Sequence, residues 1–199
     1  LVYLSSSSSK AQRHWMELTL HLPIGDWYHY DLNYWGLDYP PLTAYVSWIC
    51  GMASHYVVGP ESVAFETSRG IENPTHKAFM RATVLVLDLL VYGNAVWFAI
   101  RNRDRKSLWT IMIALCQPAI LLIDHGHFQY NTVALGLSIV SLSFIVKENF
   151  SACVWGGFFF SLALNFKQMT LYYGKRTSTG KLRTQCSENK KQRNATGKS

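Results

Sequence analysis

Cysteine is scarce in this chain, and its few cysteines are too widely spread to form a recognisable site. The 199 residues include four of them, Cys50, Cys116, Cys153 and Cys186. Neither a CxxC pair nor a regular spacing links these positions, which argues against a zinc site and against a disulfide framework. Three of the four lie in apolar runs, where we expect them to pack as small hydrophobic side chains.

Residues 1–173 also lack an excess of charge of either sign. They contain 11 Lys and Arg against 11 Asp and Glu, so the net charge of +7 comes from residues 174–199, where eight basic residues face one acidic residue (8 − 1 = +7). This basic tail has no apolar periodicity, and we expect it to be disordered. Because the basic charge belongs to the tail and not to the body, we predict no nucleic-acid partner.

The body has no uninterrupted apolar run of the ~20 residues that a transmembrane helix prefers, yet four shorter runs come close. They are Thr83–Ile100, Leu108–Ile123, Val133–Val146 and Ala152–Phe166. The basic cluster at residues 101–106 follows the first run and indicates a cytoplasmic end. We therefore predict a mainly α-helical protein with about four membrane spans, in which the polar clusters at the other ends of the runs share the non-cytoplasmic side.

Residues 1–82, before these runs, show a different sequence pattern. Residues 1–10 include five consecutive serines, a low-complexity start for which we predict no structure. Apolar residues recur every three or four positions between Ala11 and Leu22, which predicts a short amphipathic helix. The run Leu42–Val58 predicts a helix lying at the membrane interface. The expected division is thus 1–10, a loop region over 11–82 with amphipathic helices, the spans of 83–173, and the tail 174–199.

The stretch Trp35–Tyr45 places one carboxylate in a stiff aromatic loop. Pro40 and Pro41 fix their own φ angles, and Pro40 also disfavours helical geometry at Tyr39. Asp38 therefore lies on a defined turn. Its carboxylate suits either a base or a substrate-orienting group, and a cap for the helix beyond the prolines is an equally good interpretation.

Further polar residues interrupt or end the apolar runs. His125 and His127 are candidates for binding a phosphate or a metal, although hydrogen bonding at the interface is the more common role of such a pair. Asp88, inside a run, must face the bundle interior, with Arg81 or Asn94 as the expected partner. Lys167 ends a run, where it either reaches the interface or contacts a lipid phosphate.

Three polar clusters fall on the same side of the predicted bundle: Asp38 with its aromatic neighbours, residues 124–131, and Lys167 with Gln168. A glycosyl transfer needs a base, groups that hold a departing phosphate, and flat aromatic faces against sugar rings. The clusters contain candidates for each role, which predicts a sugar site at a membrane surface.

Several motifs resemble one family, the endoplasmic-reticulum glucosyltransferases that use dolichyl phosphate glucose and have the multi-span GT-C architecture. The matching stretches are Ala11–Glu17, Trp35–Tyr45, Thr67–Gly70, His76–Arg81, Gly126–Asn131 and Asn165–Met169. The form of Gly36–Tyr45 is similar to that of members that add the first glucose, in α-1,3 linkage, to the Man9GlcNAc2 oligosaccharide on dolichyl pyrophosphate.

The resemblance implies an inverting enzyme of the endoplasmic-reticulum membrane that needs no metal and no cofactor and acts at the lumenal face. The donor would be dolichyl phosphate glucose, and the acceptor a dolichyl-pyrophosphate-linked oligosaccharide. The residues that we expect to bind substrate are Arg13, His14, Asp38, Tyr39, His125, His127, Gln129, Tyr130, Lys167 and Gln168.

Two departures from the family pattern bear on activity. In the family, Ala-Gln-Arg-His-Trp follows Gly-Asp-aromatic-Glu, whose Asp is the proposed base, whereas here Ser8 occupies that position. After Tyr173 the family continues through several further spans, whereas this chain runs into the basic tail, which we expect to be unrelated to the family. We therefore expect a truncated form that is inactive alone. The alternatives are the sister enzyme that adds the second glucose and a non-catalytic or transporter-like membrane protein, although the chain shows no internal repeat.

Overall fold

The computed structural model describes residues 2–71, 73–101, 108–147 and 149–174, with side chains from Ser9 onward, Leu108 excepted. These residues are mainly helical and contain no strand, which confirms the prediction of a mainly α-helical protein. The α-helices are α1 (Val2–His21), α2 (Pro41–Val57), α3 (Pro74–Leu87), α4 (Asn94–Arg101), α5 (Leu108–Leu115), α6 (Pro118–Ile120), α7 (Asn131–Ile145) and α8 (Phe150–Phe166). Short 3₁₀ segments are η1 (Ile24–Asp26), η2 (Pro60–Val63) and η5 (Gln168–Thr170), and π-helical segments are η3 (Asp88–Gly93) and η4 (Leu121–His125).

Helix α1 is longer than the sequence pattern predicts. The expected helix began at Ala11, but α1 already begins at Val2 and includes the serine run, so the prediction of no structure there is wrong. Serine costs at most about 0.7 kcal/mol per residue in a helix interior relative to alanine, which a packed helix tolerates. The helix ends at His21 before Pro23, whose extended backbone (φ −64°, ψ 150°) leads into η1.

Helices α1 and α2 pack closely against each other. A Cβ atom added to Gly51 would lie 2.8 Å from the backbone oxygen of Met16, so only glycine permits this approach. Ala11 and Trp15 of α1 and Ala44 of α2 form a buried apolar cluster with residues of the intervening loop. This cluster fixes the loop 22–40 against both helices.

The segments α3, η3 and α4 form one continuous helix, Pro74–Arg101, of 28 residues. Asn73 caps it, because its side chain accepts a hydrogen bond from the Thr75 amide at 2.9 Å. By length and composition it is the one helix of the described residues that qualifies as a membrane span, while Trp109–His125, Asn131–Ile145 and Phe150–Phe166 are apolar but shorter. The predicted apolar runs are thus helical.

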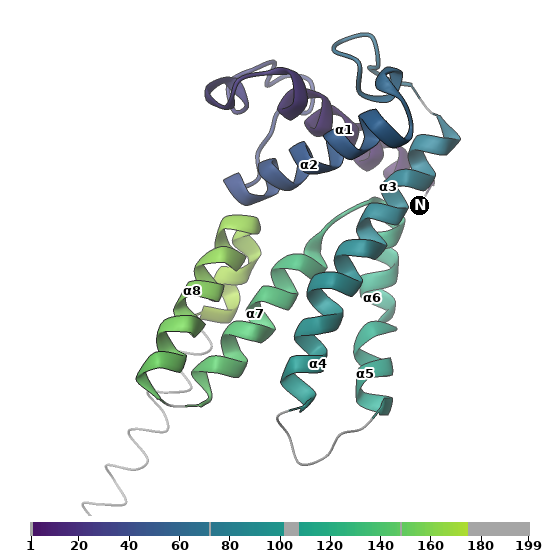
Figure 1. Cartoon of the computed structure of the whole chain (residues 1–199). Helices are drawn as coiled ribbons and strands as arrows, with labels where there is room; N and C mark the ends of the chain where they lie inside the picture. Colours follow the sequence, from purple (N-terminus) through teal and green to yellow (C-terminus); the bar gives the residue numbers. More distant parts are fainter. Residues whose placement is uncertain (1, 72, 102–107, 148, 175–199) are drawn as a thin grey trace, which may run out of the picture.

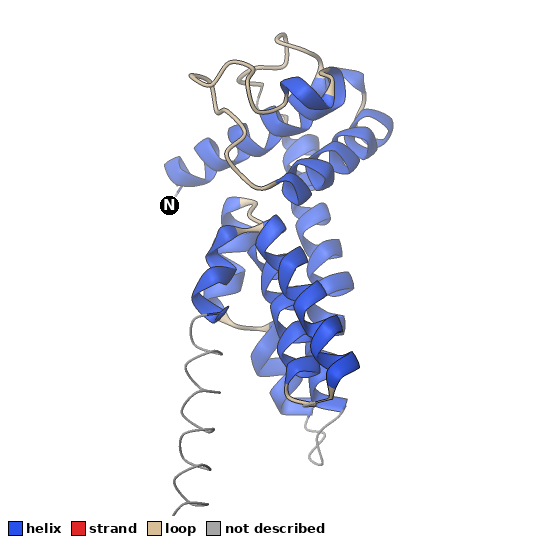
Figure 2. Cartoon of the chain, turned by 90° about the vertical axis from the view of Figure 1, so that its left-hand side faces the viewer, coloured by secondary structure: helices blue, strands red, loops and turns tan. Residues whose placement is uncertain are grey.

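Figures 1 and 2 show α1 and α2 lying across one end of the longer helices, which run side by side away from them. Helices α7 and α8 are in close contact, with the Ser141 hydroxyl donating to the Gly156 carbonyl at 2.7 Å. The connection 126–130 and the C-terminal end of α8 both lie at the end nearest α1 and α2. The polar clusters of the sequence therefore meet at one end of the bundle.

Candidate functional site

A pocket of about 300 Å³ lies where the loop before α2, the loop before α7 and the end of α8 meet. Its lining residues are Asp38, Tyr39, Pro40, Gln129, Asn131, Lys167, Gln168 and Met169. All three polar clusters of the sequence contribute to it. Of the predicted binding residues, the structure brings together Asp38, Tyr39, Gln129, Lys167 and Gln168.

Lys167 is the central cation of this pocket. Its backbone is extended (φ −146°, ψ 131°) immediately after α8, so its side chain leaves the helix and turns to the pocket. The ammonium donates to Asn131 Oδ1 at 2.6 Å and to Gln129 Oε1 at 3.4 Å, and it lies 4.6 Å from the Tyr39 ring centroid. The hydroxyl of Thr43 donates to the Phe166 carbonyl at 2.5 Å, which ties α2 to this turn.

The environment of Lys167 weakens its hold on a proton. Burial lowers its pKa from 10.5 to about 8, although the carboxylates of Asp124 and Asp38 act in the opposite direction. The side chain is 5% exposed and none of its described hydrogen-bond partners is a carboxylate. A buried ammonium in such a setting can bind an anion, because the negative charge of the anion would offset the cost of removing the ammonium from water.

Asp124 holds the loop before α7 in place. Its two carboxylate oxygens accept from Asn131 Nδ2 at 2.7 Å and from the Thr132 amide at 2.8 Å. Phe128, with φ +55° and a side chain that is 1% exposed, adopts a left-handed backbone that is uncommon for a large residue. Asn131 is thereby oriented toward Lys167. Asn131 was absent from the predicted binding residues, although it ends the matching stretch Gly126–Asn131.

The loop before α2 is fixed by its aromatic residues. Trp15 Nε1 donates to the Trp35 carbonyl at 2.8 Å, and the Tyr28 hydroxyl donates to the Tyr39 carbonyl at 2.9 Å. The N-cap position of α2 is Pro40, and no side chain caps the helix. The interpretation of Asp38 as a helix cap is therefore wrong, and its carboxylate lines the pocket instead.

His125 and His127 lie outside the pocket lining and do not converge. His125 Nε2 is 2.7 Å from Asp88 Oδ2, whereas His127 Nδ1 is 3.0 Å from the Leu122 carbonyl oxygen. Asp88 also accepts a short hydrogen bond from the Thr132 hydroxyl. The expected partners of Asp88, Arg81 and Asn94, were thus wrong. Across the described ranges, no group of three or more His, Cys, Asp and Glu side chains is arranged to hold a metal ion.

Arg13 and His14 belong to a buried network on α1, away from the pocket. Glu17 accepts from Arg13 Nη1 at 2.9 Å, lies 3.4 Å from His14 Nδ1, and accepts from the Glu66 amide at 2.7 Å. Burial raises the pKa of the Glu17 carboxyl, but the bonds from His14 and Glu66 and the charge of Arg13 outweigh it, so the net shift is downward. The network joins α1 to the 64–68 turn.

Tyr130, a further predicted binding residue, does not line the pocket. Tyr130 is 3% exposed, its hydroxyl lies 3.0 Å from Thr83 Oγ1, and burial raises its pKa. Ser8 lies in α1, but its side chain is outside the described part of the structure. The binding role of Tyr130 and the loss of the catalytic base at Ser8 stay predictions.

The sequence matches the ALG6, ALG8 glycosyltransferase family over residues 3–198. The chain belongs to this family. It is 51% identical over 171 residues to a probable dolichyl pyrophosphate Man9GlcNAc2 alpha-1,3-glucosyltransferase of Schizosaccharomyces pombe, 48% over 174 residues to one of Dictyostelium discoideum, and 45% over 174 residues to the Saccharomyces cerevisiae protein of that name. Each match covers 82% of this chain and 33%, 33% and 31% of the respective relative.

The chain thus spans about a third of the length of these curated relatives. The family membership confirms the resemblance drawn from the motifs, and it identifies a glycosyltransferase family. The pocket residues come from Trp35–Tyr45, Gly126–Asn131 and Asn165–Met169, three of the stretches on which the resemblance rests.

Proposed function

We propose that this chain binds dolichyl phosphate glucose through the Lys167 pocket, as part of an α-1,3-glucosyltransferase that extends Man9GlcNAc2 on dolichyl pyrophosphate. The observation that carries the proposal is the buried Lys167 ammonium, which lies between the Tyr39 ring and the amide oxygens of Gln129 and Asn131. A phosphodiester would satisfy the ammonium, and an aromatic face suits a sugar ring.

The proposed setting is the endoplasmic-reticulum membrane, with the helices of residues 74–166 as several spans and the pocket on the lumenal side. Large apolar side chains point outward along these helices, among them Leu90, Trp97, Ile113 and Phe158, each more than half exposed. A continuous apolar exterior of this kind is suited to lipid contact. The basic cluster at 101–106 supports a cytoplasmic end opposite the pocket.

Two observations favour this function over the alternatives. The relatives named above carry the name of the enzyme that acts on Man9GlcNAc2, which favours addition of the first glucose over the second. A transporter-like protein would have its binding site midway along the bundle, whereas the described pocket lies at its end, between the connecting loops.

Binding of the donor tests the proposal directly. The chain, in lipid nanodiscs, is incubated with a photoreactive analogue of dolichyl phosphate glucose, and unlabelled donor competes for crosslinking. We expect saturable labelling that Lys167→Ala weakens at least tenfold, because the variant leaves the phosphate without a cation.

Lys147→Ala is the matched control. Lys147 is also a lysine at a helix end, exposed and 5.1 Å from the Phe144 ring centroid, but it follows α7 at the opposite end of the bundle from the pocket. Its loss should leave labelling unchanged. Equal labelling of the Lys167→Ala variant and the parent chain would contradict the proposal.

A further inference from the structure

Asp124 is a buried carboxylate that lies behind the wall of the Lys167 pocket. It comes from η4, is 1% exposed, and is not one of the lining residues. None of the described Lys, Arg and His side chains forms a salt bridge with it. One residue connects it to the pocket, because the Asn131 side chain bonds to Asp124 on one side and to Lys167 on the other.

The Asp124 carboxylate determines which end of the Asn131 amide faces Lys167. A carboxylate offers only acceptors, so Asn131 turns its NH₂ group to Asp124 Oδ1, at 2.7 Å. The amide oxygen then points the other way and accepts from the Lys167 ammonium at 2.6 Å. Asn131 Nδ2 also donates to Gln129 Oε1 at 3.2 Å, and that oxygen lies 3.4 Å from the ammonium. Both amide acceptors of Lys167 are therefore held in place from Asp124.

The second oxygen of Asp124 makes the carboxylate difficult to replace. It accepts from the Thr132 backbone amide at 2.8 Å, so both oxygens face N–H donors, and both contacts favour the ionised form. An asparagine at this position would set its own NH₂ group against one of the two donors. If its oxygen kept the Thr132 amide, Asn131 would have to turn over and present its NH₂ group to Lys167.

Two carboxylates face the Lys167 ammonium, and neither is hydrogen-bonded to it within the described structure. Asp124 acts from behind Asn131, and Asp38 acts from the loop before α2. Burial lowers the pKa of Lys167 to about 8, and the negative charges of Asp124 and Asp38 keep that pKa from falling further. The Tyr39 ring covers another side, and the remaining lining residues carry no charge.

The Asn131 side chain separates the Asp124 carboxylate from the ammonium. A carboxylate in direct contact with the ammonium would compete with a phosphate for the same N–H donors. A carboxylate that is one side chain farther away still stabilises the positive charge. Lys167 has three N–H donors and two described acceptors, which leaves a donor for an anion in the pocket.

We propose that Asp124 is a positioning residue for the phosphate of the donor, because through Asn131 it orients the Lys167 ammonium and keeps it charged. Asp124 itself touches no ligand. The inference rests on the proposed function, since it takes the anion in the pocket to be the phosphate of dolichyl phosphate glucose.

The test follows labelling by the photoreactive donor analogue, with the chain in lipid nanodiscs, at pH values on both sides of the Lys167 pKa of about 8. Asp124→Asn should weaken labelling at neutral pH about tenfold, through loss of the oriented acceptor and of the charge. It should also move the midpoint of the decline down by about one pH unit, because loss of the negative charge favours the neutral amine. The midpoint compares labelling within one variant, so a smaller folded fraction does not move it.

Two further variants separate the charge of Asp124 from its shape. Asp124→Glu keeps the charge and both acceptors but lengthens the side chain, so it should weaken labelling and leave the midpoint near that of the parent chain. In the Lys167→Arg background, Asp124→Asn should introduce no decline with pH, since arginine stays charged.

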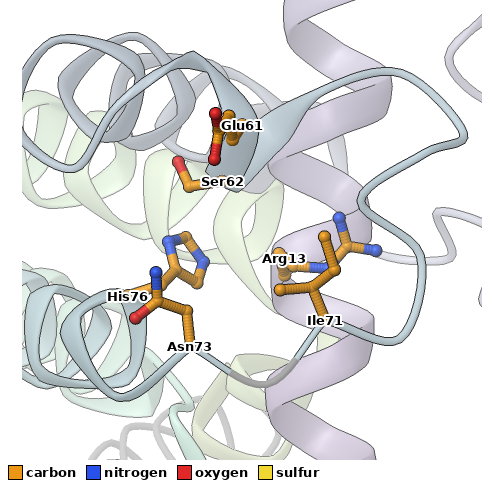
Figure 3. Close-up of a pocket in the computed structure, with 6 residues that line it drawn as sticks. All are labelled: Arg13, Glu61, Ser62, Ile71, Asn73 and His76. Carbon is orange, nitrogen blue, oxygen red and sulfur yellow. The ribbon is translucent and has the colours of Figure 1, made fainter.

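Glu61→Gln is the control for the loss of one negative charge. Glu61 is exposed and lines a separate pocket of about 60 Å³, which Figure 3 shows with Arg13 and His76 among its lining residues. The two pockets share no lining residue, so labelling and its midpoint should stay unchanged. Asp88→Asn removes another buried carboxylate, one that bonds to the Thr132 hydroxyl, and should lower stability without moving the midpoint.

A midpoint that Asp124→Asn leaves in place would overturn the inference, as would a midpoint that Asp124→Glu lowers to the same extent. Labelling that Asp124→Asn reduces equally at every pH, complete loss included, would give Asp124 a purely structural role and overturn it as well. If the parent chain is not labelled, or Lys167→Ala is labelled equally, the proposed function fails. If labelling depends on Lys167 but its midpoint does not depend on Asp124, only this inference fails.

Discussion

Asp88 and His125 are joined within the helical bundle, with Asp88 Oδ2 and His125 Nε2 2.7 Å apart. Both residues lie in π-helical segments, η3 and η4. A π-helical turn shifts the following side chains relative to regular α-helical spacing, and such turns frequently occur at functional sites. Thr132 bonds to the other oxygen of Asp88 and, through its amide, to Asp124. The pair is thereby connected to the residues that hold Asn131 in the Lys167 pocket.

We predict that Asp88→Asn destabilises the chain by about 1–3 kcal/mol, because the half-buried His125 loses a charged acceptor. Unfolding of the chain, in nanodiscs, measures the loss. A double-mutant cycle with His125→Gln isolates the pair, and its coupling energy should account for about half of the loss or more. A coupling energy near zero would show that the contact contributes nothing.

The pKa of Lys167 gives a pH dependence with opposite signs for binding and stability. Because the folded-state pKa is about 8 and the ordinary value is 10.5, the folded chain loses this proton first as the pH rises. Donor binding should therefore weaken above about pH 8, since a neutral amine does not hold a phosphate. Stability of the empty chain should rise between these two values, because the unfolded chain still binds the proton.

Lys167→Arg supplies the check on that prediction. Arginine stays charged at all these pH values, so its donor labelling should show no decline above pH 8. A decline of the same size in parent and variant would assign the pH dependence to another group.

The sequence allowed the helices and the meeting of the polar clusters to be predicted, because apolar runs and the positions of their ends are local features. The partners of Asp88 could not be predicted in this way. His125 and Thr132 reach Asp88 from other helices, and the π-helical turns that align them leave no signal in apolar spacing. Arg81 and Asn94 were the expected partners only because they are close in the chain.

The role of Asp38 also could not be predicted from its position in the sequence. Its distance from the helix suited a cap, but α2 begins at Pro41 and the residue before it, Pro40, takes φ −59° and ψ 163°. That backbone sets the start of the helix beyond the reach of an Asp38 cap.

Neighbouring glycines on α8 offer a test of the contact between α7 and α8. A Cβ atom at Gly156 would lie 2.6 Å from Ile145 Cγ1 and 3.1 Å from the Ser141 carbonyl oxygen, whereas one at Gly157 meets nothing within 4 Å. We expect Gly156→Ala to destabilise the chain by about 1–3 kcal/mol through overpacking. Gly157→Ala should be neutral or stabilise it by up to about 1 kcal/mol, because alanine favours the helix.

Unfolding of the two variants under identical conditions measures the difference. The comparison cancels the effect of the alanine itself, since both substitutions occur within the same helix. If Gly156→Ala is as stable as Gly157→Ala, the helices separate at no cost and the contact is not close-packed in solution.

Ser8 bears on turnover, because the resemblance to the glucosyltransferases assigns this position to the catalytic base. A serine hydroxyl does not act as a base at neutral pH without an activating group, and loss of a general base costs about 10²–10⁴ in rate. We therefore predict that microsomes lacking the endogenous enzyme, and supplied with this chain, form no monoglucosylated lipid-linked oligosaccharide.

The Schizosaccharomyces pombe relative, expressed in the same microsomes, is the reference. Donor labelling through Lys167 should persist in this chain, since Lys167 lies in a separate motif. Product formed by the chain at a rate within tenfold of the reference would contradict the assignment of the base to position 8.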